Sequence, residues 1–196
     1  MSQIVFTIGH STHTLERFTS LLSLHAITAL CDVRSTPYSQ INPHFNREEL
    51  KSSLLACGVR YVFLGKELGA RSDDLSCYEN GRVRYDRLAQ SILFRQGLER
   101  LQEGVKTYRI ALMCAEKEPL ECHRTILVSR HISDLGFDVQ HILADGSLER
   151  HAVALNRLVK ILNLRQGDMF RPRSDIFEAA YRLQEDRIAF KLDDAT

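Results

Sequence analysis

The chain has 196 residues, 44% of them hydrophobic and 26% charged, which is ordinary for a globular domain. Its formal net charge of +1 gives no bulk electrostatic indication of a nucleic-acid or membrane partner. No apolar run approaches the ~18 residues that a membrane-spanning helix needs, which excludes such a helix. Five irregularly spaced cysteines are typical of reduced thiols. We therefore expect a cytoplasmic protein without a membrane partner.

The first part of the chain alternates between apolar strands and a helix. Residues 4–8 form a short apolar run that predicts a strand, and Gly9-His10-Ser11 follows it directly. Residues 14–25 carry leucine and phenylalanine at helical spacing and predict a helix. A second buried strand is predicted at 27–33, where the chain ends the strand with Asp32-Val33-Arg34-Ser35. Each of these strands leads into polar side chains.

The middle of the chain predicts a helix, a strand and a long polar loop. Asn46 can cap a helix that runs to about Ala56. Residues 59–64 predict a third strand. The polar stretch 65–84 is predicted to be a loop, and a loop of this length is more often a functional flap than a plain connection. Residues 85–102 predict one long helix.

The next predicted strand ends in a thiol. This fourth strand, at 108–114, runs into Cys114 and then into a short polar loop that contains Glu116. Pro119 suits the first turn of a helix, because its missing N–H needs no partner there, and the helix is predicted to run to Leu135. A fifth strand at 137–143 and a helix at 148–162 complete the alternation.

The first turn of the predicted helix at 119–135 carries three chemically versatile side chains. At ~100° per residue, Arg124 falls on the apolar face and is expected to reach the rim of the sheet, whereas Cys122 is expected to point away. His123 flanks the apolar face. A helix N-terminus and an arginine both favour an anion. Alternatively, Arg124 pairs with a nearby carboxylate and ties loops together.

Strands that alternate with helices predict a mainly parallel sheet covered on both faces. We therefore predict an α/β fold, a three-layer Rossmann-like domain with about five strands over residues 1–162. Residues 163–196 are predicted to be a C-terminal helical extension, in which Ser174 can cap a helix that packs on the domain or pairs with a second subunit. Arginines that flank Phe170 in this extension could form a small basic and aromatic patch, at Arg165, Arg171 and Arg173.

The carboxyl ends of parallel strands meet at one rim of a sheet, where ligands bind in such folds. Four polar segments are therefore expected to converge there. The predicted catalytic candidates are His10, Cys114, Glu116 and His123, and the predicted ligand-binding candidates are Ser11, Asp32, Arg34, Ser35 and Arg124. Each has a plain structural alternative, such as a salt bridge between Asp32 and Arg34, or an inert buried thiol at Cys114.

Three mechanisms fit these side chains. The rim could bind an anion through Arg34 and Arg124 while a histidine moves protons. Cys114 could be a nucleophile, with its pKa lowered by a neighbouring histidine or arginine. A metal site is the weakest of the three, since there is no Cys-x-x-Cys pair and Cys122 is expected to face away. We therefore predict no metal ligand, and the sequence identifies no cofactor.

Four motifs occur in a fixed order along the chain. They are Thr7-Ile-Gly-His-Ser11, Asp32-Val-Arg-Ser-Thr-Pro37, Leu68-Gly69 and Cys114-Ala-Glu-Lys-Glu-Pro-Leu-Glu-Cys-His-Arg124. Together they resemble a widespread bacterial family, the domain of unknown function 488, over roughly residues 3 to 145. The resemblance implies a compact cytoplasmic α/β domain and no particular reaction. The matching signature positions are His10, Arg34, Glu116, His123 and Arg124.

The sequence favours an enzyme with an anion-binding pocket at the rim, for a phosphate-bearing ligand such as a nucleotide or a nucleic-acid end. Such an enzyme would be a hydrolase or a transferase. The alternatives are a nucleic-acid-associated binding module, for which the balanced charge is unfavourable, and a dimeric regulatory protein without catalysis. A homodimer through the last helix fits either class.

Overall fold

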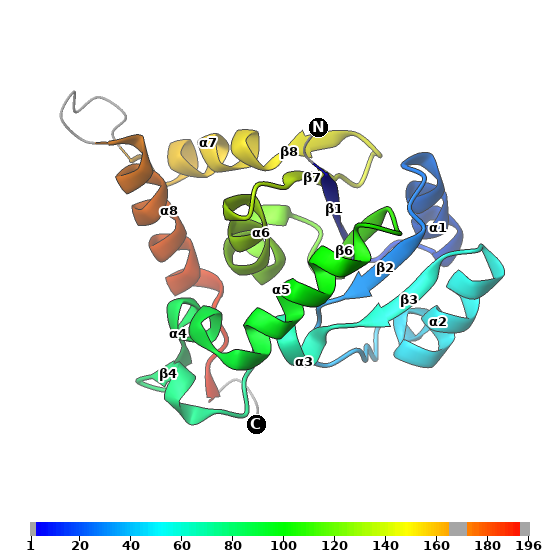
Figure 1. Cartoon of the computed structure of the whole chain (residues 1–196), viewed down its shortest axis with the longest axis horizontal. Coiled ribbons are helices and arrows are strands. Elements are labelled where there is room, and N and C mark those ends of the chain that lie inside the picture. Colours follow the sequence, from blue (N-terminus) through cyan, green and yellow to red (C-terminus); the bar gives the residue numbers. More distant parts are fainter. Residues whose placement is uncertain (1–2, 165–171, 193–196) are drawn as a thin grey trace.

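The computed structural model describes residues 3–164 and 172–192. Its centre is a six-stranded sheet with the strand order β3-β2-β6-β1-β7-β8, shown edge-on among the helices in Figure 1. All neighbouring strands are parallel except the last pair, β7 and β8. The strands are β1 (Ile4–Gly9), β2 (Ala29–Asp32), β3 (Arg60–Phe63), β6 (Ile110–Cys114), β7 (Asp138–Ile142) and β8 (Leu148–Arg150).

Helices cover both faces of the sheet, so the predicted three-layer Rossmann-like α/β fold is confirmed. One face packs against α1 (Leu15–Leu24) and α2 (Arg47–Ala56), where Phe18 and Leu50 are fully buried. The other face packs against α5 (Ile92–Gly104) and α7 (His151–Ile161). Figure 1 shows α1 and α2 on the opposite side of the strands from α5.

The number of strands differs from the prediction because residues 148–150 are not helical. They form β8, which pairs antiparallel with β7, and α7 begins only at His151. In the same way, the helix predicted at 85–102 is two helices, α4 (Tyr85–Gln90) and α5. The break falls at Ser91, whose backbone is extended and whose hydroxyl accepts a hydrogen bond from the N–H of Phe94 (3.1 Å).

The stretch predicted as a long loop at 65–84 is largely ordered into short elements. It contains α3 (Gly65–Leu68), a 3₁₀ turn (Leu75–Cys77) and a hairpin of β4 (Tyr78–Glu79) and β5 (Arg82–Val83).

The side chain of Asn46 does not cap α2, contrary to the prediction. Its Oδ1 instead accepts a hydrogen bond from the N–H of Ser39 (2.7 Å).

The helix predicted at 119–135 is broken, and the break shapes the site. A 3₁₀ turn (Pro119–Glu121) ends at Cys122, whose φ of −136° and ψ of 139° are those of a strand. A π-helical segment (Arg124–Ser129) and then α6 (Arg130–Asp134) follow. The hydroxyl of Ser129 donates to the carbonyl of Arg124 (2.7 Å), five residues earlier, which supports the widened turn.

The C-terminal helix α8 (Arg173–Ile188) packs on the domain against α7 and the π-helical segment. Beyond it, the backbone joins the small hairpin: the N–H of Val83 donates to the carbonyl of Phe190 (3.0 Å), and that of Leu192 to the carbonyl of Gly81 (2.9 Å). The predicted basic and aromatic patch falls mostly outside the described residues, at Arg165, Phe170 and Arg171.

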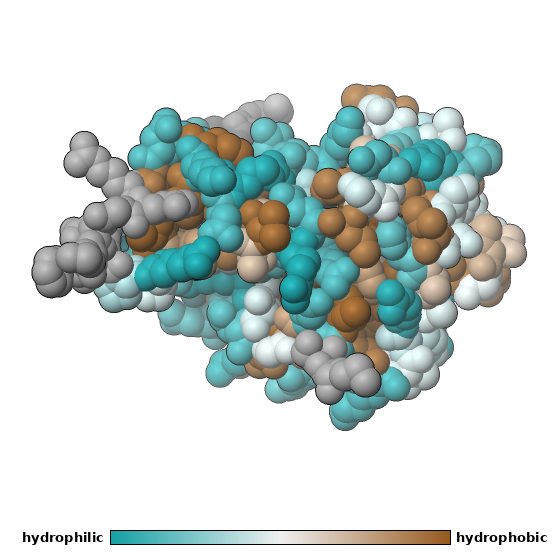
Figure 2. All heavy atoms as spheres, turned by 90° about the horizontal axis from the view of Figure 1, so that it is seen from above, coloured by the Kyte–Doolittle hydropathy of each residue, from teal (hydrophilic) through white to brown (hydrophobic). Residues whose placement is uncertain are grey.

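The surface is of mixed hydropathy, and the helices in the described part of the chain do not have the length and apolar character of membrane spans, as the composition led us to expect. Seen from above, hydrophilic side chains are interspersed with separate hydrophobic patches (Figure 2). Among residues 3–164 and 172–192, every helix is too short or too polar to cross a membrane.

Candidate functional site

A pocket of about 520 Å³ opens at the rim where β1, β2 and β6 end. The register places Gly9 beside Cys114 and Asp32 beside Met113, so the segments that follow these strands are neighbours. We call this cavity the rim pocket. Six predicted site residues line it, and they are His10, Arg34, Ser35, Cys114, Glu116 and His123.

The structure thus brings most of the predicted site residues together, but three stand apart from the pocket lining. Asp32 is fully buried beneath Arg34. Ser11 adopts a left-handed backbone (φ 49°) and contributes its carbonyl to His10 rather than its hydroxyl. Arg124 is fully buried behind the loop that carries Glu116.

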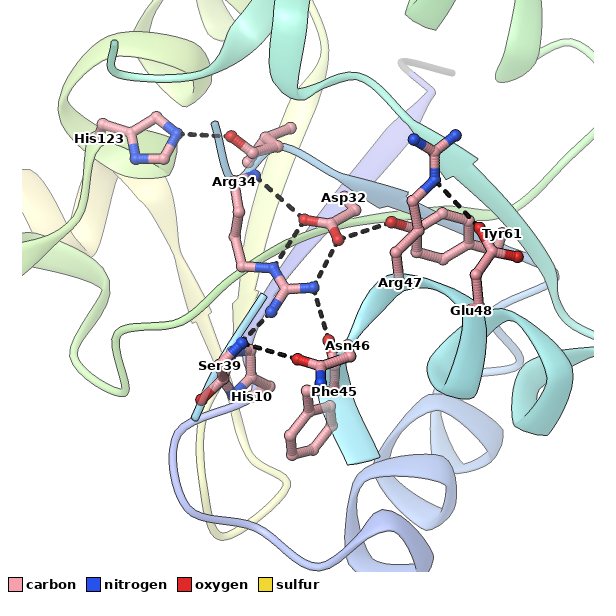
Figure 3. A network of polar contacts seen from close by, with 11 residues as sticks. His10, Asp32, Arg34, Ser39, Phe45, Asn46, Arg47, Glu48, Tyr61 and His123 are labelled. Carbon is pink, nitrogen blue, oxygen red and sulfur yellow. Dashed lines mark hydrogen bonds and ion pairs between the residues drawn. The ribbon is translucent and has the colours of Figure 1, made fainter. Parts of the chain in front are cut away.

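Arg34 is held by a buried network that Figure 3 shows in full. Its Nε donates to Asp32 Oδ1 (2.9 Å) and its Nη2 to Asp32 Oδ2 (2.7 Å), which forms a two-point ion pair. Nη2 also donates to the carbonyl of Phe45 (2.8 Å), and Nη1 to His10 Nε2 (3.2 Å). Of the five N–H groups of an arginine, these contacts leave one, on Nη1. The ring hydroxyl of Tyr61 donates to Asp32 Oδ2 (2.8 Å) and completes the network.

His10 is a neutral imidazole whose two nitrogens are both engaged. Nδ1 lies 2.9 Å from the carbonyl of Ser11, which can only accept, so Nδ1 carries the proton and Nε2 accepts from Arg34. Burial lowers the pKa of His10 to about 4, and the positive charge of Arg34 contributes. The ring also stacks on Phe45, with centroids 4.3 Å apart. This arrangement suits a residue that orients Arg34 better than a proton carrier.

The loop that carries Glu116 is fixed by Gly9 and Arg124. A Cβ on Gly9 would lie 1.9 Å from the carbonyl oxygen of Glu116, so only glycine allows β1 and this loop to approach so closely. Arg124 Nη1 donates to that same carbonyl (2.7 Å), and its Nη2 lies 3.4 Å from the carbonyl of Lys117. Arg124 therefore ties loops together, through backbone carbonyls rather than through the carboxylates we considered.

Two thiols, an imidazole and a carboxyl group meet at the base of the rim pocket. The Nδ1 atom of His123 lies 3.7 Å from Cys114 Sγ and 3.9 Å from Cys122 Sγ. Cys122 Sγ is hydrogen-bonded to Glu116 Oε2 (2.9 Å), so these two groups share a proton. The prediction that Cys122 points away is wrong, because the extended backbone at Cys122 turns its side chain inward.

The pKa values of the two thiols are shifted in opposite directions. Burial raises the pKa of Cys114 well above the ordinary thiol value, contrary to the lowering we expected. Burial also opposes ionisation of Cys122, but the hydrogen bond from Cys114 and the charges of Arg124 and His123 outweigh it and hold its pKa well below the ordinary value. Burial and the neighbouring Cys122 raise the pKa of Glu116. The more acidic thiol is therefore Cys122.

The outer wall of the rim pocket comes from residues that sequence reasoning missed. The wall adds three exposed cations: Arg71 from the segment after α3, Arg187 from the last turn of α8, and Lys191 from the segment that follows α8. The Arg71 guanidinium stacks over the ring of Phe190 (4.2 Å to the centroid), and the backbone N–H of Arg71 donates to Ser35 Oγ (3.0 Å). Arg71 lies within the stretch 65–84, which was predicted only as a functional loop, beyond a short helix after β3. Arg187 and Lys191 do not follow a strand of the main sheet, so the rule used on the sequence could not find them.

Comparison with known proteins found a match to one protein family. The model of DUF488, a domain of unknown function, matches residues 14–131. This span includes Asp32, Arg34, Cys114, Glu116 and His123. Searches of curated proteins and of solved structures each found no match.

Proposed function

The chain belongs to the DUF488 family, and we propose that it is an enzyme that binds a small phosphate-bearing anion, such as a nucleotide or a nucleic-acid end, in the rim pocket. One observation carries the proposal. A single cavity is lined both by cations that can hold an anion and by the sulfur, carboxyl and imidazole groups that can react with it. We infer a hydrolase or a transferase, since these classes act on phosphate-bearing substrates with such groups.

The charge of the pocket lining favours an anion. The cations are Arg34, Arg71, Arg187 and Lys191, whereas the carboxyl groups are Glu116 and Glu121. Because the pKa of Glu116 is raised, its carboxyl group is more readily neutral than that of an ordinary glutamate. An anion that enters would replace water around the exposed cations and reach the remaining N–H of Arg34. Charge-assisted hydrogen bonds of this kind are about twice as strong as neutral ones.

The position of Arg34 suits a recognition residue. Its side chain is 5% exposed and is oriented by Asp32, Phe45 and His10, so little side-chain entropy remains to be lost when a ligand binds. We assign acid–base chemistry to Glu116 and His123, which line the same cavity. His10 is assigned a positioning role, because its free lone pair is occupied by Arg34.

A matched pair of arginines on α8 tests the proposal. Both Arg187 and Arg182 are exposed, but only Arg187 lines the rim pocket. Pyrophosphate and ADP serve as probes, and binding is measured by isothermal titration calorimetry at low salt. We expect Arg187→Ala to weaken binding roughly fivefold or more, the effect of about 1 kcal/mol, and Arg182→Ala to leave it unchanged.

The result must also depend on salt and on Arg34. Because the contacts are ionic, the affinity of the wild-type protein should fall as ionic strength rises. Arg34→Lys should weaken binding further, since a lysine cannot keep the planar set of donors. An anion site in this pocket would be contradicted if neither probe binds at low salt. It would also be contradicted if Arg187→Ala and Arg182→Ala reduce the binding affinity equally.

A further inference from the structure

Three of the side chains at the base of the rim pocket form a group with the spacing of metal ligands. The sulfurs of Cys114 and Cys122 and the Nδ1 of His123 all lie within 4.8 Å of one another, and all three residues are buried. In a tetrahedral zinc site, with Zn–S near 2.3 Å and Zn–N near 2.0–2.1 Å, neighbouring ligand atoms are roughly 3.5–3.8 Å apart. The observed N–S separations of 3.7 and 3.9 Å are close to these values.

The imidazole of His123 is already oriented as a metal ligand. Its Nε2 donates to the carbonyl of Val33 (3.0 Å) at the end of β2. Because the carbonyl of Val33 holds the proton on Nε2, the proton lost when the ring becomes neutral is the one on Nδ1, and the lone pair of Nδ1 is then directed at the two sulfurs. A hydrogen bond from the second ring nitrogen to a backbone carbonyl is the arrangement that orients most metal-binding histidines.

The charge balance also fits a divalent ion. Two thiolates and one divalent cation are neutral together, which allows the group to remain buried. The sulfur of Cys122 accepts the N–H of Arg124 (3.4 Å), a contact that stabilises a thiolate. Thiolate and imidazole ligands select zinc-like ions over magnesium or calcium.

From these contacts we propose that Cys114, Cys122 and His123 bind one zinc ion, or a similar thiophilic divalent ion, at the base of the rim pocket. This goes beyond the anion site and does not depend on it. Cys114 and His123 line the cavity and Cys122 does not, so we expect an ion held by the three to have its open coordination position on the side of the pocket. Three protein ligands with one open position are typical of catalytic rather than structural zinc. Glu116, which is hydrogen-bonded to Cys122 Sγ, lines the same cavity.

The binding step itself needs no oxidant or reductant. Zinc replaces the protons of the two thiols, which pass to the solvent, and the lone pair of His123 completes the set without a change of oxidation state. The sequence pattern gave no indication of this site because the two cysteines are seven residues apart and the intervening break in the helix is what brings them together.

Cobalt(II) provides the first test, because thiolate ligands give it an intense charge-transfer absorption and tetrahedral geometry gives it strong visible bands. The reduced full-length protein, stripped with a chelator, is titrated with cobalt(II) and then with zinc(II). We expect one equivalent of cobalt(II) to produce both absorptions, and one equivalent of zinc(II) to abolish them. A wild-type protein that shows neither absorption with excess cobalt(II) overturns the proposal.

Substitutions locate the ion. Cys122→Ser should weaken cobalt affinity more than roughly 100-fold, since loss of an outer-shell partner alone costs 10–100-fold. The control is Cys57→Ser, which removes an exposed cysteine far from the cluster in the sequence and should bind like wild type. Because Cys122→Ser could impair folding, zinc protection of wild-type Cys114 from iodoacetamide is read by mass spectrometry as a second measurement, at an alkaline pH at which Cys114 of the zinc-free protein is alkylated. Equal alkylation of Cys114 with and without zinc, or loss of binding in Cys57→Ser, counts against the site.

Discussion

Arg34 and Asp32 are joined by two parallel hydrogen bonds of 2.9 and 2.7 Å although they are only two residues apart in the chain. Asp32 is the last residue of β2, and Arg34 turns back over it at the rim. The pair is buried: the side chain of Asp32 is 0% exposed and that of Arg34 is 5% exposed. A buried charge without its partner is costly, so this pair makes the geometry of the rim pocket inseparable from the stability of the fold.

Asp32→Asn should therefore be strongly destabilising. The amide keeps the shape of the side chain but leaves the Arg34 guanidinium without a counter-charge, and removal of one partner of a buried pair costs about 3–5 kcal/mol. Urea unfolding measures the change. Glu48→Gln is the control, because it disrupts an exposed pair with Arg47 (3.7 Å) and should cost at most about 1 kcal/mol. Similar losses in the two variants would contradict this account.

Tyr61→Phe tests the support of Asp32 from β3. The variant removes only the hydroxyl that donates to Asp32 Oδ2 (2.8 Å). A hydrogen bond to a charged group contributes about 1.5–3 kcal/mol, so we expect a loss in that range in urea unfolding. In the double variant with Asp32→Asn, the loss of stability should be smaller than the sum of the losses in the two single variants, because both substitutions affect one network. Strict additivity would mean that the hydroxyl acts elsewhere.

The sequence was sufficient to predict the fold class and the convergence of His10, Arg34, Cys114 and His123 on one pocket. The strands can be recognised from the pattern of neighbouring residues, and parallel strands then bring their carboxyl ends to one rim. It was insufficient where a distant contact determines the backbone. Cys122 is extended within what reads as one helix, and its neighbour Arg124 is buried against carbonyls of the preceding loop. Helical spacing alone therefore placed Cys122 on the wrong side.

The wall of the rim pocket shows the same limit. Arg187 and Lys191 approach Arg34 only because the C-terminal segment pairs with the β4–β5 hairpin, through contacts between residues about 100 positions apart. Neither the charge pattern nor the periodicity of α8 predicts that the C-terminal segment pairs with the hairpin. Contacts that depend on the final packing of distant segments are not available to a reading of local pattern.

Gly9→Ala should distort the site and destabilise the fold. The new methyl group would meet the backbone carbonyl of Glu116, which Arg124 also holds, so neither side can move cheaply. Overpacking of this kind costs typically about 1–3 kcal/mol or more. Gly104→Ala is the control, because its methyl group meets only the end of the Ile110 side chain at 2.9 Å. Thermal unfolding should show the larger decrease for Gly9→Ala; the reverse order would contradict the close approach.

The protonation of His10 can be observed directly. With burial lowering its pKa to about 4, the ring should remain neutral across the physiological range, with its proton on Nδ1. Long-range ¹H–¹⁵N correlation spectra report both the tautomer and the titration midpoint. A midpoint near the ordinary value of about 6.5, or a proton on Nε2, would mean that His10 does not accept the hydrogen bond from Arg34.

A buried relay of side chains predicts how stability depends on pH. Thr7 Oγ1 lies 2.8 Å from His141 Nδ1, His141 Nε2 lies 3.1 Å from His151 Nδ1, and His151 Nε2 lies 2.8 Å from the hydroxyl of Tyr181. This chain joins β1 and β7 to α7 and α8. Burial lowers the pKa of His141 well below the ordinary value and that of His151 to about 4.

The sign of the effect follows from proton linkage. Between pH 6.5 and 4 the unfolded chain binds a proton at His151 that the folded chain does not, so the free energy of unfolding falls as the pH falls through this window. From pH 7 to pH 5 this residue alone should account for about 2 kcal/mol of the loss. His123, whose pKa is raised, acts in the opposite direction and partly offsets the total.

His151→Gln separates this contribution from the rest. Glutamine can still hydrogen-bond to Tyr181 but carries no titratable proton, so the variant should be less stable than wild type at pH 7 and yet lose about 2 kcal/mol less between pH 7 and pH 5. Urea unfolding at the two pH values gives both differences. If wild type and His151→Gln lose the same stability on acidification, His151 titrates in the folded protein as it does in the unfolded chain, and burial within the relay does not lower its pKa.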